Sequence, residues 1–362
     1  MKDLVQLNQT HRVRPVRLAL WAVAAAAALA GTTGTVAAEA DAASALKADS
    51  ALHLRKEAHF KHPKLAHGLL TIEGTEATDN IALRLQAAQP DVLQVDVGDD
   101  GSPDFSFKRE KITKITVDAQ AGDDLVRIDE GNGVFTDGIP TTIDGGDGSD
   151  TIAGGKGIET LLGGDGNDSI DGNGGNDVTS MGTGDDVFVW DPGDGSDVVE
   201  GEDGADTMVF NGAGVAEQVE LSANGSRLRF FRSPGTITMD TDGVERVEFN
   251  ALGGSDDVTV NDLTGTDVSD VNVDLAGTPG GATGDGQADR VVINGTNGDD
   301  AIDVSGDAEV VKVSGLAATE ILHPEVANDR LEINTLAGTD TVDSRGLAAG
   351  AIQLIVDGVL VP

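Results

Sequence analysis

The sequence predicts an all-β protein: a parallel β-roll, or β-helix (a β-solenoid), of short repeats flanked by longer β-solenoid repeat modules. Three observations support this prediction. A nine-residue unit recurs seven times between Gly145 and Val209, and a longer unit recurs three times around it. No stretch beyond the N-terminus shows a sustained helical period with caps. Stacked repeats of this kind bury one continuous core.

Residues 1–38 have the composition of a secretory signal peptide. Basic residues precede an apolar run of 13 residues, Leu18 to Ala30, which is short for a membrane span. Val36 and Ala38 occupy positions −3 and −1 of a cut before the next residue. We therefore expect a secreted, extracellular protein, cleaved near Ala38, with no membrane span in the mature chain. An uncleaved anchor is the alternative.

Residues 39–69 are rich in Ala, Lys and His, with four histidines between His53 and His67. Imidazole is a common zinc ligand, but no regular spacing places these rings together. We interpret the segment as a mobile basic linker that contacts the acidic body, and we assign it no site.

The long repeat defines three modules, at residues 70–144, 208–290 and 291–362. Its two halves align without gaps over 70–83, 208–221 and 291–304, and over 115–126, 247–258 and 331–342. In the second half a glycine is followed two residues later by aspartate, as Gly122/Asp124, Gly254/Asp256 and Gly338/Asp340. Short alternating apolar and polar runs predict strands throughout. The acidic, glycine-rich stretch 262–288 is expected to be a strand followed by a loop.

The nonapeptides occupy residues 145–209 and follow the pattern GGxGxDxUx, where U is a large apolar residue. The units are GGDGSDTIA, GGKGIETLL, GGDGNDSID, GNGGNDVTS, MGTGDDVFV, PGDGSDVVE and GEDGADTMV, with Trp190 and Asp191 interrupting after the fifth. The first six residues suit a tight turn, and the last three suit a short strand whose middle side chain points inward. Those inward residues are Ile152, Leu161, Ile170, Thr179, Phe188, Val199 and Met208. Each unit is half a coil, so each turn should stack on the turn two units away.

Position six of the unit is acidic in all seven copies. One edge of the roll would carry Asp150, Asp168, Asp186 and Asp206, and the other Glu159, Asp177 and Asp197. Like charges about 4 Å apart repel by about 4 kcal/mol at an effective dielectric of about 20, so the stack needs a cation. A hard ion with about six to eight oxygen ligands in flexible geometry favours calcium over magnesium. Aspartates that only cap turn backbone are the alternative.

The two edges are not expected to bind equally well. Lys156 and Ile158 stand in the first turn of the second edge, and Asn173 replaces a glycine in the next. We therefore expect filled sites to concentrate on the first edge.

The array resembles the RTX, or hemolysin-type, calcium-binding repeats of secreted bacterial proteins over residues 145–209. The resemblance implies Ca2+ as the cofactor, held by the position-six acids and turn residues. The implied metal-binding residues are Gly145, Gly148, Asp150, Glu159, Gly163, Asp165, Gly166, Asp168, Asp177, Asp186, Asp197 and Asp206. The chain departs from the family in two ways. Many members export through a C-terminal signal, and its toxins and exoenzymes carry a separate active domain that is not visible here.

Two further groups of residues are expected to be structural. The module acids occupy one turn per long coil, which is more often a solvated turn than a metal site. They are Asp123, Asp124, Asp256, Asp257, Asp299, Asp300 and Asp340. Trp190 stands at the break in the array, so we expect a packed plug and not a platform that stacks on sugar.

Composition excludes several classes of function. With 63 acidic and 24 basic residues, the formal net charge is −39, which argues against binding to nucleic acid or anionic lipid. There is no cysteine, so no disulfide or thiolate metal site is available. The sequence contains no zinc-protease HExxH, serine-hydrolase GxSxG or phosphate-binding P-loop motif, and His323 is expected to be a loop residue.

We therefore expect a secreted calcium-binding repeat protein with a structural or adhesive role, and not an enzyme. It would fold on binding calcium outside the cell, where sites of about 10⁻⁴ to 10⁻³ M affinity fill. Its partners would be calcium ions and a cell-surface glycan or another extracellular matrix component. The alternative is an extracellular β-helix enzyme of lyase or epimerase type, acting on acidic polysaccharide with calcium as a structural ion. Such an enzyme would need a basic or aromatic-lined cleft, and this chain has few arginines and aromatic residues.

Overall fold

The structure is a computed structural model that describes residues 60–281, 284–325 and 328–362. The predicted signal peptide and the predicted linker up to residue 59 lie outside these residues. Within the described part, no helix is long and apolar enough to cross a bilayer. The helix found there is η1, a single 3-10 turn at Arg109–Lys111, and the other regular elements are strands.

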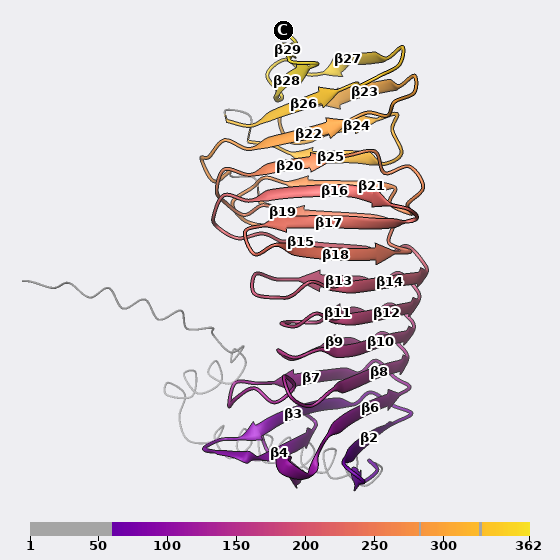
Figure 1. Cartoon of the computed structure of the whole chain (residues 1–362), viewed down its shortest axis with the longest axis vertical. Coiled ribbons are helices and arrows are strands. Elements are labelled where there is room, and N and C mark those ends of the chain that lie inside the picture. Colours follow the sequence, from indigo (N-terminus) through magenta and orange to yellow (C-terminus); the bar gives the residue numbers. More distant parts are fainter. Residues whose placement is uncertain (1–59, 282–283, 326–327) are drawn as a thin grey trace, which may run out of the picture. The chain divides into compact units, whose positions relative to one another are not determined.

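Two sheets of mostly parallel strands wind together as a solenoid, which confirms the predicted all-β fold (Figure 1). The first sheet has 15 strands, in the spatial order β1 (Lys64–Ala66), β2 (Leu69–Thr75), β6 (Lys114–Gln120), β8 (Thr141–Asp147), β10 (Glu159–Asp165), β12 (Val178–Thr183), β14 (Val198–Asp203), β18 (Ile237–Asp242), β17 (Arg227–Ser233), β16 (Gln218–Asn224), β20 (Asp257–Val260), β22 (Arg290–Asn294), β26 (Arg330–Asn334), β28 (Gln353–Val356) and β29 (Val359–Leu360). The second sheet has 14 strands, in the order β27 (Thr341–Leu347), β23 (Ala301–Gly306), β24 (Val311–Ser314), β25 (Thr319–His323), β21 (Asp270–Asp274), β19 (Arg246–Asn250), β15 (Thr207–Asn211), β13 (Val187–Trp190), β11 (Ser169–Asp171), β9 (Thr151–Ala153), β7 (Leu125–Asp129), β3 (Asn80–Gln86), β4 (Gln89–Val97) and β5 (Phe105–Lys108).

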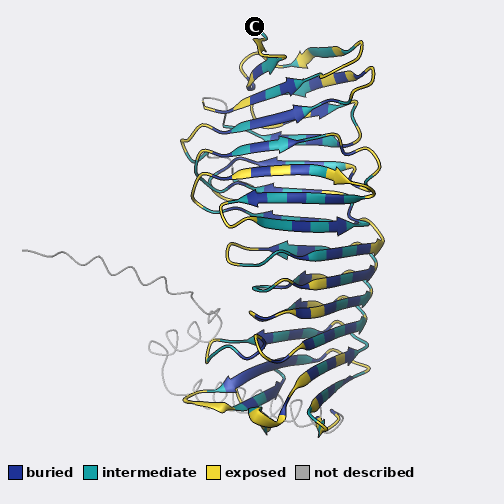
Figure 2. Ribbon diagram, viewed as in Figure 1, coloured by how far each residue is buried: buried dark blue, intermediate teal, exposed yellow. Residues whose placement is uncertain are grey.

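Within the array, successive strands alternate between the sheets and pair in parallel two units apart. Ile152, Ile170 and Phe188 lie opposite one another in β9, β11 and β13. Leu161 lies opposite Thr179 in β10 and β12. All seven predicted inward side chains are buried, and buried residues alternate along the strands (Figure 2). Both the predicted stacking and the predicted inward face are confirmed.

Each long repeat contains an antiparallel three-stranded meander: β3–β5, β16–β18 and β23–β25. The first and third meanders extend the second sheet, and the middle one extends the first sheet. Two extra strands return the chain to its original direction, so parallel stacking resumes where β16 pairs with β20. A long coil therefore adds strands without disturbing the solenoid.

Two expectations about chain segments are wrong. Residues 60–69 belong to the fold and not to the linker, because Phe60 is buried in the core and β1 pairs antiparallel with β2. The ring of His62 also contacts that of Phe105, with 4.5 Å between centroids. A three-residue strand is too short for an alternating pattern to reveal it in a basic sequence. His323 ends β25 and does not lie in a loop.

Trp190 is a packed plug, as predicted. The side chain is fully buried and stacks on Phe210, with 3.9 Å between ring centroids. Its Nε1–H donates to the Gly195 carbonyl at 2.8 Å, and the Arg232 guanidinium lies 5.2 Å from the ring. A sugar has no access to this ring.

Candidate metal centre

The position-six acids of the first edge form a ladder, because each ends a turn just before a strand of the second sheet. The backbone N–H of Asp150 donates to Oδ1 of Asp168 at 2.7 Å. Asp168 donates to Asp186 at 2.7 Å in the same way, and Asp186 donates to Asp206 at 2.9 Å. All four side chains are buried. One oxygen of each carboxylate thus caps the backbone of a neighbouring coil.

The second edge carries a shorter ladder of the same kind. The N–H of Glu159 donates to Oδ1 of Asp177 at 2.7 Å, and that of Asp177 to Oδ1 of Asp197 at 2.8 Å. Its first turn differs, because the N–H of Gly155 donates to Oε2 of Glu159 at 2.9 Å. Asn173 adopts a left-handed φ of 55° at a position that most units fill with glycine, and Glu202 does so at 73° in the last unit. The substitutions noted in the sequence are therefore accommodated without breaking the ladder.

The second oxygen of every position-six carboxylate is buried and unpaired within the described part of the molecule. These atoms are Oδ2 of Asp150, Asp168, Asp177, Asp186, Asp197 and Asp206, and Oε1 of Glu159. Buried polar atoms in folded proteins almost always have a partner, and leaving one unpaired costs about 1–3 kcal/mol, more for a charge. A repeated set of such atoms indicates a positively charged ligand.

In five of the seven units the first residue is a glycine, and the position-six carboxylate packs closely against it. A Cβ at Gly145 would overlap Oδ2 of Asp150 and the carbonyl oxygen of Gly163. A Cβ at Gly163 would overlap Oδ2 of Asp168 and the carbonyl oxygen of Met181. Carboxylate and carbonyl oxygens, the donors that calcium prefers, therefore lie close together beside the first glycine.

Strand pairing changes at this same glycine. The pairs between β8 and β10 run to Asp144–Leu162, skip one residue and resume at Gly146–Gly164. Gly146 and Gly164 have φ values of 101° and 116°, a conformation that an L side chain rarely adopts. The backbone conformation after the skipped pair thus favours glycine at the second position of the unit, although Asn173 and Glu202 also adopt it.

The pKa values of the ladder carboxylates are raised above the usual range of a carboxyl group when no cation is present. Burial is the main cause, and it raises the pKa of Asp168 and Asp206 to about 7 and that of Asp177 to about 8. Repulsion from neighbouring carboxylates, the adjacent rungs of the ladder, also raises the pKa, as Asp150 and Asp186 do for Asp168. A nearby positive charge would lower these pKa values and favour the ionised form.

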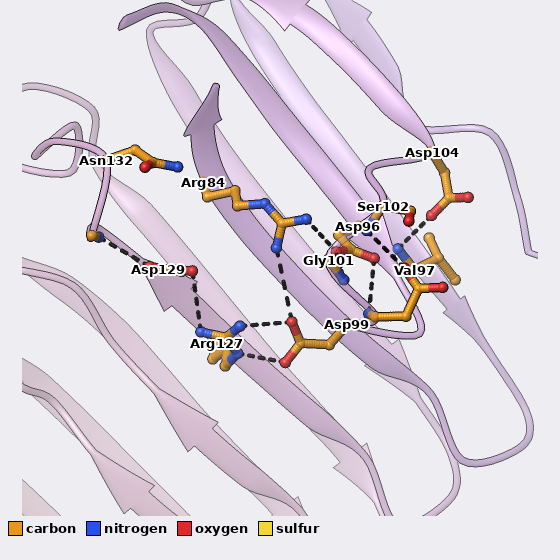
Figure 3. Close-up of polar contacts among 12 residues, drawn as sticks. Arg84, Asp96, Val97, Asp99, Gly101, Ser102, Asp104, Arg127, Asp129 and Asn132 are labelled. Atoms are coloured by element: carbon orange, nitrogen blue, oxygen red, sulfur yellow. Dashed lines mark hydrogen bonds and ion pairs between the residues drawn. The ribbon is translucent and has the colours of Figure 1, made fainter. Parts of the chain in front are cut away.

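Arginine supplies that charge elsewhere in the solenoid. In the first module, Arg84 pairs with Asp96, and Arg127 binds Asp99 through Nε at 2.5 Å and Nη2 at 2.7 Å (Figure 3). Residues 145–209 contain 16 acidic residues and one basic residue, Lys156. The array ladders therefore have no internal counter-cation of this kind.

The ladder of the first edge extends beyond the array, which the sequence did not predict. The N–H of Asp124 donates to Oδ1 of Asp150 at 2.7 Å, and Asp124 in turn accepts from the N–H of Asp79 at 2.6 Å. At the other end, the N–H of Asp206 donates to Oε2 of Glu245 at 2.7 Å. The unit is irregular in length here, so no fixed period marks these rungs.

The expectation of solvated turns is wrong for three module acids. Asp124, Asp256 and Asp300 are buried, whereas the other four module acids are exposed or half-buried. Asp124 and Asp256 also have an unpaired Oδ2, like the array acids. The glycine two residues before each of them does not distinguish them, because Gly338 precedes the half-buried Asp340 in the same way.

The remaining predicted metal residues divide into two groups. The turn glycines stack directly: Gly148 and Gly166 have φ values of 135° and 133°, and a Cβ on Gly166 would overlap the Gly148 carbonyl oxygen. Asp165, in contrast, is exposed and accepts from Oγ1 of Thr183 at 3.1 Å. The structure brings the position-six acids and the glycines together and leaves the Asp165 carboxylate at the surface.

A cation would fit this centre only by using backbone oxygens as well. Among residues 60–281, 284–325 and 328–362, no three Asp, Glu or His side chains are arranged to hold a metal. The reason is that each turn contributes one carboxylate. The unpaired carboxylate oxygens and the neighbouring turn carbonyls suit a hard cation, and the array has no His or Cys to offer.

No family model matches the chain, and no curated protein is significantly similar to it. The resemblance to RTX repeats is therefore carried by the nonapeptide motif of residues 145–209.

Proposed function

We propose that the protein is a secreted, RTX-like calcium-binding repeat protein with a structural or adhesive role. The observation that carries the proposal is the set of seven buried position-six carboxylates, each with one unpaired oxygen. Ca2+ would be held by Asp150, Asp168, Asp186 and Asp206 on the first edge and by Glu159, Asp177 and Asp197 on the second, with turn carbonyls completing the shell. Bound there, the ion supplies the positive charge that the array lacks.

Calcium would then control folding of residues 145–209. A ligand that binds only the folded state adds about 2.7 kcal/mol per site at one hundred times its dissociation constant. Several sites together outweigh the cost of gathering buried carboxylates. The array would stay unfolded at the low calcium level of the cytosol and fold after export. An adhesive role adds a partner such as a cell-surface glycan or another matrix component.

Calorimetric titration of the purified protein with calcium tests this proposal. We expect saturable binding at several sites, together with loss of part of the β signal in circular dichroism when EDTA is in excess. Asp168→Asn should weaken binding at least tenfold, because it removes a charge from the middle of the ladder but keeps the Oδ1 acceptor. Asp165→Asn is the matched control, since that carboxylate is exposed three residues away.

Two outcomes would overturn the proposal. One is a β signal and a melting temperature that EDTA leaves unchanged. The other is equal loss of calcium affinity in the Asp165→Asn and Asp168→Asn proteins.

A further inference from the structure

The turn Leu252–Asp256 repeats the array turn outside the nonapeptides. Leu252 and Gly254 have φ values of 65° and 117°. Gly182 and Gly184, at the same distances before Asp186, have φ values of 110° and 133°. A leucine in the left-handed region is strained, so the fold imposes this conformation against the preference of the residue.

The carboxylate of Asp256 has the hydrogen bonds and burial of an array rung, although Ala251 stands where most array units have glycine. It is 2% exposed, and its Oδ1 accepts from the N–H of Glu217 at 2.8 Å. Its own N–H donates to Oδ1 of Asp289 at 2.7 Å. Its Oδ2 is buried without a hydrogen-bond partner. This unpaired oxygen indicates a ligand independently of the acidic cluster around it.

The next coil places a second carboxylate, in addition to that of Asp289, against this turn. Oδ2 of Asp285 accepts from the N–H of Gly254 at 2.8 Å, so this side chain reaches into the turn itself. Asp329 continues the stack, because its Oδ1 accepts from the N–H of Asp289 at 3.0 Å. Burial, with added repulsion from Asp289, Glu217 and Asp285, raises the pKa of Asp256 to about 8.

The nearby arginines are already committed to other acids. Arg232 pairs with Glu217 through Nε at 2.6 Å. Arg290 pairs with Asp257 at 2.8 Å and with Glu332 at 2.7 Å. A groove of about 640 Å³, whose lining includes Ser255 and Asp256, lies beside this end of the turn.

We infer that the turn Leu252–Asp256, with Asp285 and Asp289, is a second divalent-cation site, separate from the nonapeptide array, and that it takes calcium. The inference rests on the proposed function only for the choice of ion. Because no three acids of the described residues are poised as a ready metal site, turn carbonyls complete the shell.

Hydrogen–deuterium exchange of the full chain, with and without calcium, tests this site and the array separately. Calcium at one hundred times its dissociation constant should slow exchange through local opening by about a hundredfold. We expect this protection at the amides of Glu217 and Asp256, which donate to the stacked carboxylates. Asp256→Asn keeps the Oδ1 acceptor and should abolish the protection there while array peptides still respond.

Two further variants complete the experiment. Asp91→Asn, at an exposed strand position, is the control and should change nothing. Asp285→Asn reduces the charge of the same turn without removing a rung, and it should weaken the protection at least tenfold even if Asp256→Asn fails to fold.

The outcomes separate the two proposals. Protection of array peptides with none at residues 252–256 overturns this inference alone. Protection at 252–256 that Asp285→Asn removes, with none in the array, supports the inference and overturns the array proposal. No calcium response in either region overturns both.

Discussion

The nonapeptide array and the long modules use the same carboxylate ladder but differ in where the balancing charge comes from. The modules place arginine beside some of their buried acids, as with Arg84 and Asp96 or Arg232 and Glu217, but not beside Asp256. The array has 16 acidic residues, one lysine and no arginine. The difference teaches that a solenoid coil can carry its counter-cation covalently or leave it to the surrounding solution. Only the second arrangement lets the environment decide whether a coil is stable.

The largest expected difference between the two regions is in their response to pH without metal. Asp168 and Asp206 have a folded pKa of about 7 and Asp177 one of about 8, against 3.8 when unfolded. Between about pH 4 and pH 8 the folded array therefore keeps protons that the unfolded chain has already released. The free energy of unfolding falls as pH rises through this window. Calorimetric melting in EDTA should show a lower temperature at pH 8 than at pH 5. Saturating calcium should reverse the order, and a higher melting temperature at pH 8 in EDTA would contradict the ladder.

Removing an internal counter-cation should have the next largest effect, and it should fall on the modules. Arg232→Met leaves Glu217 buried without its partner, which costs about 3–5 kcal/mol of unfolding free energy. Arg229→Met, on the same strand over the Phe231 ring, is the control and should cost about 1 kcal/mol or less. Urea unfolding measures both, and adding Glu217→Gln to the first variant should recover most of the loss. Equal effects of the two arginine variants would refute the distinction.

The smallest expected effect comes from closing the space beside the first glycine of a unit. Gly163→Ala places a Cβ against Oδ2 of Asp168 and the Met181 carbonyl oxygen. We expect a loss of about 1–3 kcal/mol from overpacking, together with weaker calcium binding. Gly138→Ala is the control, because a Cβ there meets nothing nearby. Thermal melting with and without calcium separates the two contributions, and unchanged calcium affinity in Gly163→Ala would show that the ion lies elsewhere.

The sequence predicted the array well because its information is periodic. A nine-residue repeat determines the stacking, the inward face and the division of the acids into two edges, and the register bears these out. The inward residues needed no tertiary information, since Ile152 and Phe188 hold the same position in their units.

The rungs outside the array could not be found in this way. The acids stacked on Asp256 lie 39 residues before it and 33 after it, because meanders and loops lengthen the coils by different amounts. Asp285 reaches its turn only through the fold, and no local pattern marks it. Asp165 differs from these rungs: the resemblance to RTX repeats implies it as a metal residue, and strand alternation turns its side chain outward.

Pairing two units apart also limits how the chain can change in length. Hydrogen-bonded rungs within the array lie 18 residues apart, so inserting or deleting a whole coil leaves every later strand in its own sheet. A change of nine residues would send each later strand to the opposite sheet and break the junction with the middle module. The two extra residues at Trp190 and Asp191 are tolerated because the indole fills the interior while the ladder step grows to 20. The length of the array can thus change only by whole coils.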